Sequence, residues 1–193
     1  KTAIQSNHEM TGMNAAQMLG FGKDNTDSSC RAFILMNVEP EFDTYNSQQA
    51  MQAMHSSELV ISMSIYKGNA ESYADVLLPI APFSETSGTY VNTEGRVQSF
   101  NGVVAPFGEA RPAWKVLRVL ANLLALDKFD YETPEQIREE IFPYGLDINQ
   151  YLSNSMKSFE CDLEESDQPK LQRIGEVPIY QADSIVRRAE SLQ

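Results

Sequence analysis

The chain has 193 residues, of which 42% are hydrophobic and 22% are charged, as is usual for a soluble globular protein. Its formal net charge of -12, from 15 basic and 27 acidic side chains, argues against nucleic-acid binding, which needs clustered lysine and arginine. The same charge disfavours adhesion to an anionic membrane, and no stretch approaches the roughly 18 apolar residues of a membrane-spanning helix. We therefore expect no nucleic-acid partner and no direct insertion into a membrane.

The start of the chain and its two cysteines indicate the cellular compartment. The chain starts at Lys1 rather than at a methionine, which suggests a piece of a longer protein, and the start has no apolar signal-peptide core. Cys30 and Cys161 are far apart and have no C-x-x-C partner. This pattern provides no disulfide framework, zinc site or cluster site, and it fits a reducing cytoplasm. We expect no metal in this chain.

Alternating apolar runs and helical stretches predict a small parallel sheet. The apolar runs have the length and composition of strands that are buried on both faces: residues 32–38, 59–65 and 75–80. Short helical or turn segments are expected before and between them: residues 14–19, 47–55 and 69–73. Strands joined by short helical crossovers indicate an α/β fold with a Rossmann-like parallel sheet.

The pattern changes after Pro82 to short strands that are separated by turn signals. Three such strands are predicted: residues 89–91, 96–100 and 103–105. The dipeptides Glu94-Gly95 and Asn101-Gly102 lie between them, and Asn-Gly is the strongest short hairpin signal. An antiparallel meander is therefore expected to follow the parallel sheet.

The remainder of the chain is predicted to be mostly helical. Pro112 opens a helix that runs to about Leu126, and Thr133 opens a second helix with a capping-box spacing. The first helix carries a predicted buried stripe made of Trp114, Leu117, Leu120, Ala121 and Leu124. If this stripe is buried, emptying the Trp114 site costs about 3–5 kcal/mol.

Two domains are predicted from these elements. Residues 1–110 form the α/β domain with the meander, and residues 111–193 form a helical extension. An acidic linker is expected near residues 160–167 because its charges favour solvent. Residues 183–192 are predicted to form a short closing helix, with Ile185, Val186, Ala189 and Leu192 on one side.

Three carboxylates come directly after the first predicted strand. Glu39, Glu41 and Asp43 would lie at a strand end, where open α/β sheets usually bind ligands. In one interpretation they orient hydroxyl or amino groups of a ligand, or bind a cation. In the other they belong to a polar, solvated turn between a strand and a helix.

The predicted hairpin carries the second group of candidate residues. Asn92 can hydrogen-bond to its own backbone in the turn, and Arg96 has a rigid fork of donors suited to a phosphate or a carboxylate. One interpretation places Arg96, Asn92 and Glu94 against a phosphate-bearing cofactor. The alternative is that Arg96 and Glu94 only tie the hairpin to the domain.

Several of these segments resemble the molybdopterin oxidoreductase superfamily. Residues 74–79 (Ala-Asp-Val-Leu-Leu-Pro), Glu85 and residues 87–98 are similar to its signature. Residues 111–114 (Arg-Pro-Ala-Trp) and the closing residues 178–193 are similar to the branch that contains the large iron–sulphur subunit of bacterial NADH:quinone oxidoreductase, respiratory complex I. The similarity covers roughly residues 7–193, with no motif at 128–176.

This resemblance implies a fragment of a molybdopterin-oxidoreductase-type fold that acts as a structural or docking segment, is not itself catalytic, and binds no molybdopterin. It implies that iron–sulphur clusters lie upstream and pass electrons from NADH to quinone. The implied partners are that upstream region and other complex I subunits, on the cytoplasmic side of the bacterial inner membrane. The alternative is the cofactor-contacting portion of an active molybdopterin oxidoreductase, similar to formate dehydrogenase or nitrate reductase. A third alternative is an independent acidic binding module.

Overall fold

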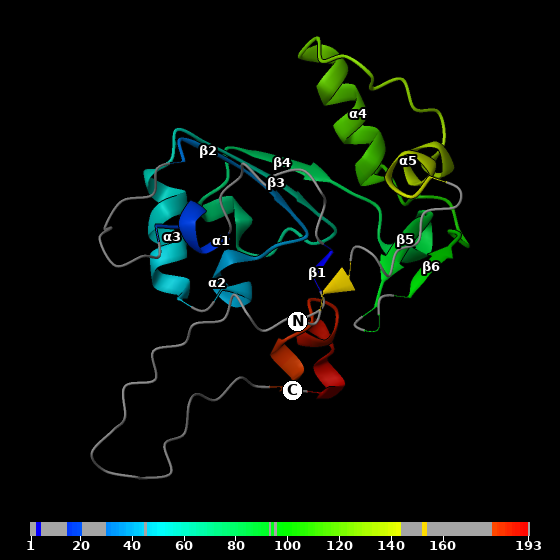
Figure 1. Cartoon of the computed structure of the whole chain (residues 1–193). Helices are drawn as coiled ribbons and strands as arrows, with labels where there is room; N and C mark the ends of the chain where they lie inside the picture. Colours follow the sequence, from blue (N-terminus) through cyan, green and yellow to red (C-terminus); the bar gives the residue numbers. More distant parts are fainter. Residues whose placement is uncertain are drawn as a thin grey trace.

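A three-stranded parallel sheet organises the first half of the chain. The computed structural model describes residues 3–4, 15–20, 30–44, 46–92, 94, 96–143, 152–153 and 179–192. The strands are β2 (Ala32–Met36), β3 (Leu59–Ser64) and β4 (Val76–Pro79), in the order β2-β3-β4. Both pairs are parallel, with Phe33 opposite Val60 and Ile61 opposite Val76. The predicted α/β fold is confirmed (Figure 1).

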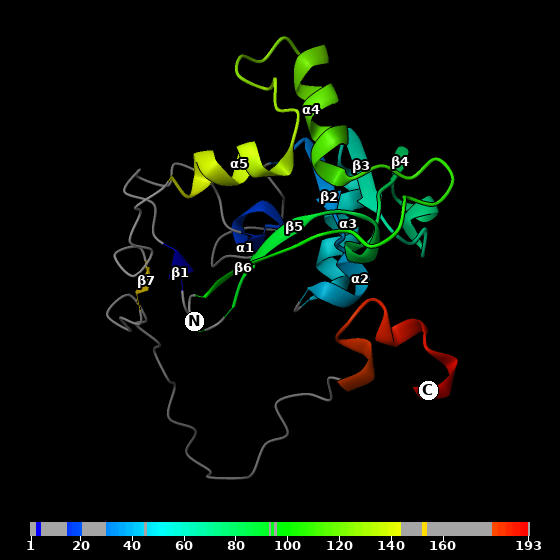
Figure 2. The same ribbon diagram turned by 90° about the vertical axis from the view of Figure 1, so that its right-hand side faces the viewer.

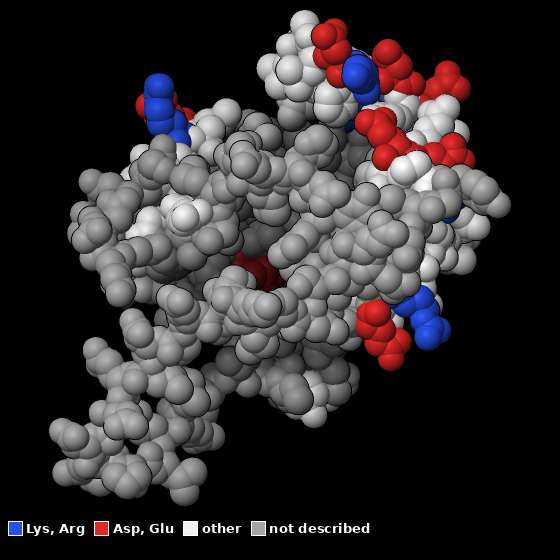
Figure 3. Space-filling model, viewed as in Figure 1, with Lys and Arg blue, Asp and Glu red and all other residues white. Residues whose placement is uncertain are grey.

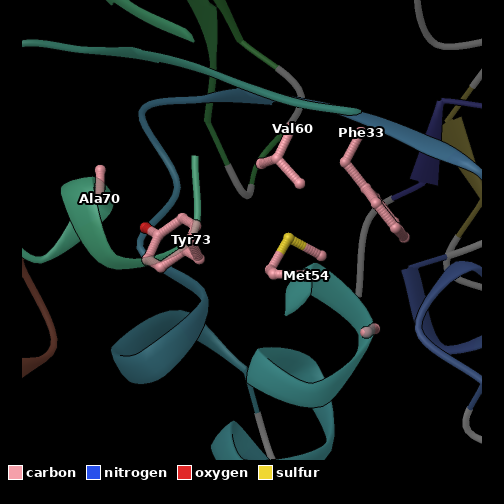
Figure 4. Packing of buried hydrophobic residues seen from close by; sticks show 6 residues of the cluster. Phe33, Met54, Val60, Ala70 and Tyr73 are labelled. Atoms are coloured by element: carbon pink, nitrogen blue, oxygen red, sulfur yellow. The ribbon is translucent and has the colours of Figure 1, made fainter. Parts of the chain in front are cut away.

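Short helices cover one face of this sheet (Figure 1). They are α1 (Ala15–Met18), α2 (Pro40–Asp43), α3 (Ser47–Ser56) and the 3-10 turn η1 (Ala70–Ser72). The core lies between α3, η1 and the strands, where Phe33, Met54, Val60, Ala70 and Tyr73 pack together (Figure 4). The α3 helix forms here because Asn46 caps it, accepting the N–H of Gln49 at 3.0 Å, and its buried stripe faces the sheet.

On the opposite face of the sheet, the structure differs from the prediction of strands that are buried on both faces. Along β2 only Phe33 is buried, whereas Ile34 is 53% exposed and Met36 is 50% exposed. Side chains alternate between the two faces of a strand, so these exposed residues share one face. Within the described ranges no helix covers that part of the sheet (Figure 1).

The antiparallel part is a two-stranded hairpin rather than the predicted three-stranded meander. Strand β5 (Gly88–Val91) pairs with β6 (Val97–Phe100), and the rings of Tyr90 and Phe100 stack at 5.2 Å. The predicted third strand does not form. The N–H of Val103 donates instead to the carbonyl of Ser84 at 2.8 Å, beside the 3-10 turn η2 (Phe83–Glu85). The N–H groups of Val103 and Val104, which a third strand could offer to β6, therefore bind the carbonyl of Ser84 instead.

Two helices follow the hairpin, α4 (Ala113–Leu123) and α5 (Pro134–Ile141). The capping box of α5 is confirmed, with Thr133 and Gln136 hydrogen-bonded reciprocally. The predicted stripe of α4 is wrong in part: Ala121 is buried, whereas Leu124 is 62% exposed. Pro112 is the N-cap residue rather than the first residue of α4. This helix extends away from the end of β4 (Figure 2).

The environment of Trp114 lowers the cost expected for its removal. Trp114 is only half-buried, and the Nζ of Lys115 lies 5.4 Å from its ring centroid. We therefore expect Trp114→Ala to lower the free energy of unfolding by about 1–2 kcal/mol, since the apolar area removed from water is small. Trp114 is the sole tryptophan, so its fluorescence reports on this site. We expect emission typical of a partly hydrated ring and ready quenching by acrylamide, whereas a blue-shifted, unquenched spectrum would contradict this environment.

The closing segment folds as 3-10 turns instead of the predicted helix: η4 (Ile179–Gln181), η5 (Val186–Arg188) and η6 (Glu190–Leu192). Figures 1 and 2 both place this segment below α2, which is far from it in the sequence. A small antiparallel pair, β1 (Ala3–Ile4) with β7 (Leu152–Ser153), was not predicted. The predicted acidic linker at 160–167 lies outside the described residues. The domain boundary at 110 stays a prediction.

Candidate functional site at the carboxyl end of the sheet

The turn after β2 holds two acidic side chains at the carboxyl end of the sheet. The strand ends when Asn37 takes a positive φ of 51°, and Pro40 then begins α2. Proline favours this position because its fixed φ suits the first turn of a helix. The N–H of Glu39 donates to Asp43 Oδ2 at 2.8 Å. This bond holds the Asp43 carboxylate at the start of α2.

Two consecutive arginines from the far end of the chain bind these carboxylates. Arg187 donates from Nη1 to Glu39 Oε2 and from Nη2 to Asp43 Oδ1, each at 2.7 Å. Arg188 donates from Nη1 to Glu39 Oε2 at 3.1 Å and from Nη2 to Glu39 Oε1. Such forked contacts to charged acceptors are stronger than neutral hydrogen bonds. The predicted acidic turn is therefore neither simply solvated nor open to a ligand, because its cation is supplied by the chain itself.

Burial gives this network its electrostatic importance. The side chains of Glu39 and Arg187 are only 9% and 6% exposed, whereas Asp43 and Arg188 are more open. A buried carboxylate is costly unless it is paired and hydrogen-bonded. The hydrogen bond to Glu39 raises the pKa of Arg188 above its ordinary value, although partial burial opposes this shift. Arg188 therefore remains charged at neutral pH.

The third predicted carboxylate, Glu41, faces a different neighbour. Its Oε2 accepts the hydroxyl of Tyr73 at 3.5 Å, which is a long contact. Burial raises the pKa of Tyr73, and the nearby negative charge of Glu41 raises it further. Tyr73 thus stays protonated and closes the core below the turn. Glu39 and Asp43 are brought together by the fold, whereas Glu41 contacts Tyr73 instead.

The predicted cofactor residues of the hairpin lie in its exposed turn. Asn92 Oδ1 accepts the N–H groups of Glu94 at 3.0 Å and of Arg96 at 2.8 Å, so Asn92 shapes the turn. Arg96 and Glu94 form a loose ion pair at 3.6 Å, with side chains that are 70% and 71% exposed. The turn therefore presents a guanidinium and a carboxylate outward. Their role toward a cofactor stays a prediction.

A separate cavity of about 620 Å³ lies between the segments that flank the hairpin and the first turns of α4 and α5. Its charged lining residues are Glu85, Arg111, Lys115, Glu132 and Glu135. The carboxylates outnumber the cations, and Arg111 already donates to the carbonyl of Ala110 at 2.8 Å. Acidic side chains also gather over α4 and α5 in the space-filling view (Figure 3). This cavity is therefore a poor site for a phosphate group.

Sequence reasoning missed Arg187 and Arg188 as members of the site. A signal was available, because an adjacent basic pair is unusual in a chain with a net charge of -12 and an acidic turn elsewhere. The separation of 148 residues between Arg187 and Glu39 hides this pairing from any local pattern. The side chains of Ile185 and Val186 were assigned to a helix face instead.

Comparison with known proteins agrees with the fold and identifies the family. A family model described as molybdopterin oxidoreductase matches residues 5–123, which is more than half of the chain. The chain belongs to the molybdopterin oxidoreductase family. This oxidoreductase segment is 41% identical, over 127 residues, to a protein named "Putative formate dehydrogenase" from Staphylococcus aureus (strain MRSA252). It is 29% identical over the same length to a protein of the same name from Staphylococcus aureus (strain bovine RF122 / ET3-1).

The molybdopterin oxidoreductase chain is short beside these relatives. Each alignment covers 62% of this chain and 13% of the relative. Among solved structures, acetylene hydratase from Pelobacter acetylenicus is similar with a TM-score of 0.51 and 23% identity, over 63% of this chain and 17% of that chain. This likeness supports the fold. Over the described part of this family member, no helix has the length and apolar character needed to cross a bilayer.

Proposed function

We propose that this chain is a segment of a larger molybdopterin oxidoreductase similar to formate dehydrogenase, and that it supports the cofactor from one side. The observation that carries the proposal is the 41% identity to a protein named as a formate dehydrogenase over 127 residues. The chemical groups in the hairpin turn are compatible with this role. A guanidinium suits a phosphate, and a carboxylate can accept the amino groups of a pterin.

In this proposal the exposed turn binds one edge of the cofactor. Arg96 would bind a phosphate, Glu94 would accept from the pterin ring, and Asn92 would hold the turn in shape through the two N–H groups that it accepts. When bound, the cofactor supplies electron transfer at its metal. The residues of this chain only bind and orient it, and other parts of the whole protein would cover its remaining surface.

The test is a comparison of two exposed arginines in the full-length protein. Arg96→Ala removes a candidate phosphate contact, whereas Arg31→Ala removes an arginine that pairs with Glu58, at 2.6 Å, away from the hairpin turn. Loss of one charge-assisted hydrogen bond weakens cofactor binding about tenfold or more. We expect Arg96→Ala to lower the molybdenum and pterin content and the rate of formate oxidation, while Arg31→Ala changes neither. A wild-type protein without molybdenum and pterin would contradict the proposal.

A second candidate function is a docking segment of the large iron–sulphur subunit of NADH:quinone oxidoreductase. The exposed apolar side chains favour it: Ile34 and Met36 on the sheet, and Leu123, which is 79% exposed, on α4. A parallel sheet is normally covered on both faces, so these residues suit a further protein layer. In this proposal the segment is non-catalytic and contains no cofactor. Its partners are the upstream iron–sulphur region and other complex I subunits, on the cytoplasmic side of the inner membrane.

Purification of the tagged full-length protein from native membranes separates the two candidates. Recovery with flavin-bearing NADH-oxidising subunits and quinone-reducing membrane subunits supports the docking segment. Recovery of a distinct enzyme that contains molybdenum and pterin supports the formate dehydrogenase-like function. The two outcomes differ in subunit composition as well as in metal content, so activity alone does not decide the result.

A further inference from the structure

The carboxyl end of β2 holds two guanidinium groups. We name Glu39, Phe42, Asp43 and Tyr66 the arginine socket. Each arginine in it meets both a carboxylate and an aromatic ring. The guanidinium carbon of Arg187 lies 4.6 Å from the ring centroid of Phe42.

Arg188 is held in the same manner, with its guanidinium carbon 4.2 Å from the ring centroid of Tyr66. A planar guanidinium can stack on a ring while its edge donates two parallel hydrogen bonds to a carboxylate, whereas a lysine ammonium is attracted to a ring but has no planar fork. The combination of a ring with a carboxylate fork therefore selects arginine over lysine. Two neighbouring sites of this kind suit two consecutive arginines.

All four carboxylate oxygens of the socket have donors. Glu39 accepts from Arg187 and Arg188 at its two oxygens, and Asp43 accepts from Arg187 at Oδ1 and from the N–H of Glu39 at Oδ2. Another cationic or hydroxyl-bearing ligand at this edge would have to displace an arginine. The acidic turn is thus occupied by groups of the chain itself.

The backbone around the socket is also shaped for this contact. Gly68 has a positive φ of 51°, and a Cβ there would lie 2.6 Å from Glu39 Oε1 and 3.1 Å from Arg188 Nη2. A glycine at this position therefore leaves room for the ion pair. On the opposite side, Asp183 Oδ1 accepts the N–H groups of Ile185 at 2.8 Å and of Val186 at 3.0 Å, which organises the turn that presents the arginines.

We propose that the arginine socket is a binding site for an Arg-Arg peptide segment, and that residues 183–189 act as a built-in strap that fills it. The strap closes the carboxyl end of β2 to other ligands. Its release would expose a site selective for peptides with two consecutive arginines. This inference is independent of which oxidoreductase the chain belongs to, because it depends only on contacts within the chain.

Hydrogen exchange of the full 193-residue chain tests the strap. In the wild type, the amides of Arg187 and Ala189 are protected because they donate at 2.9 Å to Asp183 and at 3.0 Å to Val186. We expect the double variant Arg187→Ala, Arg188→Ala to lose this protection about tenfold or more, with β3 unchanged, because local opening leaves the core intact. Arg31→Ala is the control. Unprotected amides in the wild type, or a loss that also includes β3, would overturn the strap.

Binding of a blocked Val-Arg-Arg-Ala peptide tests the socket itself. Calorimetry should detect the peptide with the double variant but not with the wild type, where the site is filled. Substitution of both peptide arginines by lysine should weaken binding about tenfold or more, since lysine lacks the fork. If the double variant does not fold, Arg188→Ala, at a side chain that is 27% exposed in the native chain, replaces it, and the peptide is then Val-Ala-Arg-Ala because Arg187 still fills its own part of the socket. Equal binding to the wild type, or none to a folded variant, would refute the proposal.

Discussion

Replacement of Glu39 by glutamine is expected to lower the free energy of unfolding by about 3–5 kcal/mol, because it leaves a buried cation without its carboxylate. The side chain of Arg187 is 6% exposed and would lose one of its two carboxylate partners, while Arg188 would lose its forked partner. Urea denaturation at neutral pH measures the change. The loss should persist in 1 M salt, since a buried pair is screened far less than an exposed one.

The matched control for this variant is Glu58→Gln. Glu58 also pairs with an arginine, Arg31, at 2.6 Å, but both side chains are mostly exposed, at 63% and 79%. Exposed ion pairs contribute little to stability, so the urea midpoint should not move measurably. Equal effects of the two substitutions would contradict a buried role for Glu39.

The second large effect is expected in the core, where Met54→Ala should cost about 2–5 kcal/mol because the surrounding side chains cannot fill the cavity. Met54 is 1% exposed and packs in the cluster between α3 and the sheet (Figure 4). Thermal or urea unfolding, followed by circular dichroism, provides the measurement. The helix itself should not suffer from the change, because alanine is the best helix former.

Met36→Ala makes the same chemical change on the open face of the sheet. Met36 is 50% exposed, so little apolar surface returns to water when its side chain is shortened. We expect a change below about 1 kcal/mol. A comparable loss at the two positions would mean that Met36 is covered in solution. If the chain also self-associates, another copy covers this face, and the assignment of Met36 to a docking surface is supported.

Local patterns predicted those elements whose signals are contained in a few neighbouring residues. The three parallel strands came from apolar runs that are too short for helices, and α5 came from the Thr133 and Gln136 capping box. Local patterns failed at 103–105, where apolar character and Asn-Gly predicted a strand. Val103 there binds the carbonyl of Ser84 instead, and such competition between possible partners cannot be read from either segment alone.

Burial was predicted less well than secondary structure. The stripe of α4 has the period of a buried helix face, yet Leu124 is 62% exposed and Trp114 is half-buried. Periodicity states which residues share a face, but it does not state whether another layer is present to cover it. The same reason explains β2, whose apolar run was interpreted as buried on both faces although Ile34 is exposed.

The sequence by itself determined the parallel α/β sheet, the hairpin, the capped helix and, through the motif at 74–98, the superfamily. Only the tertiary structure decided which groups bind the carboxylates of the acidic turn after β2. Its carboxylates were open to two interpretations because their partners lie 144 or more residues away along the chain. A buried charge requires a partner, but the identity of that partner depends on which distant segment the fold brings within hydrogen-bonding distance.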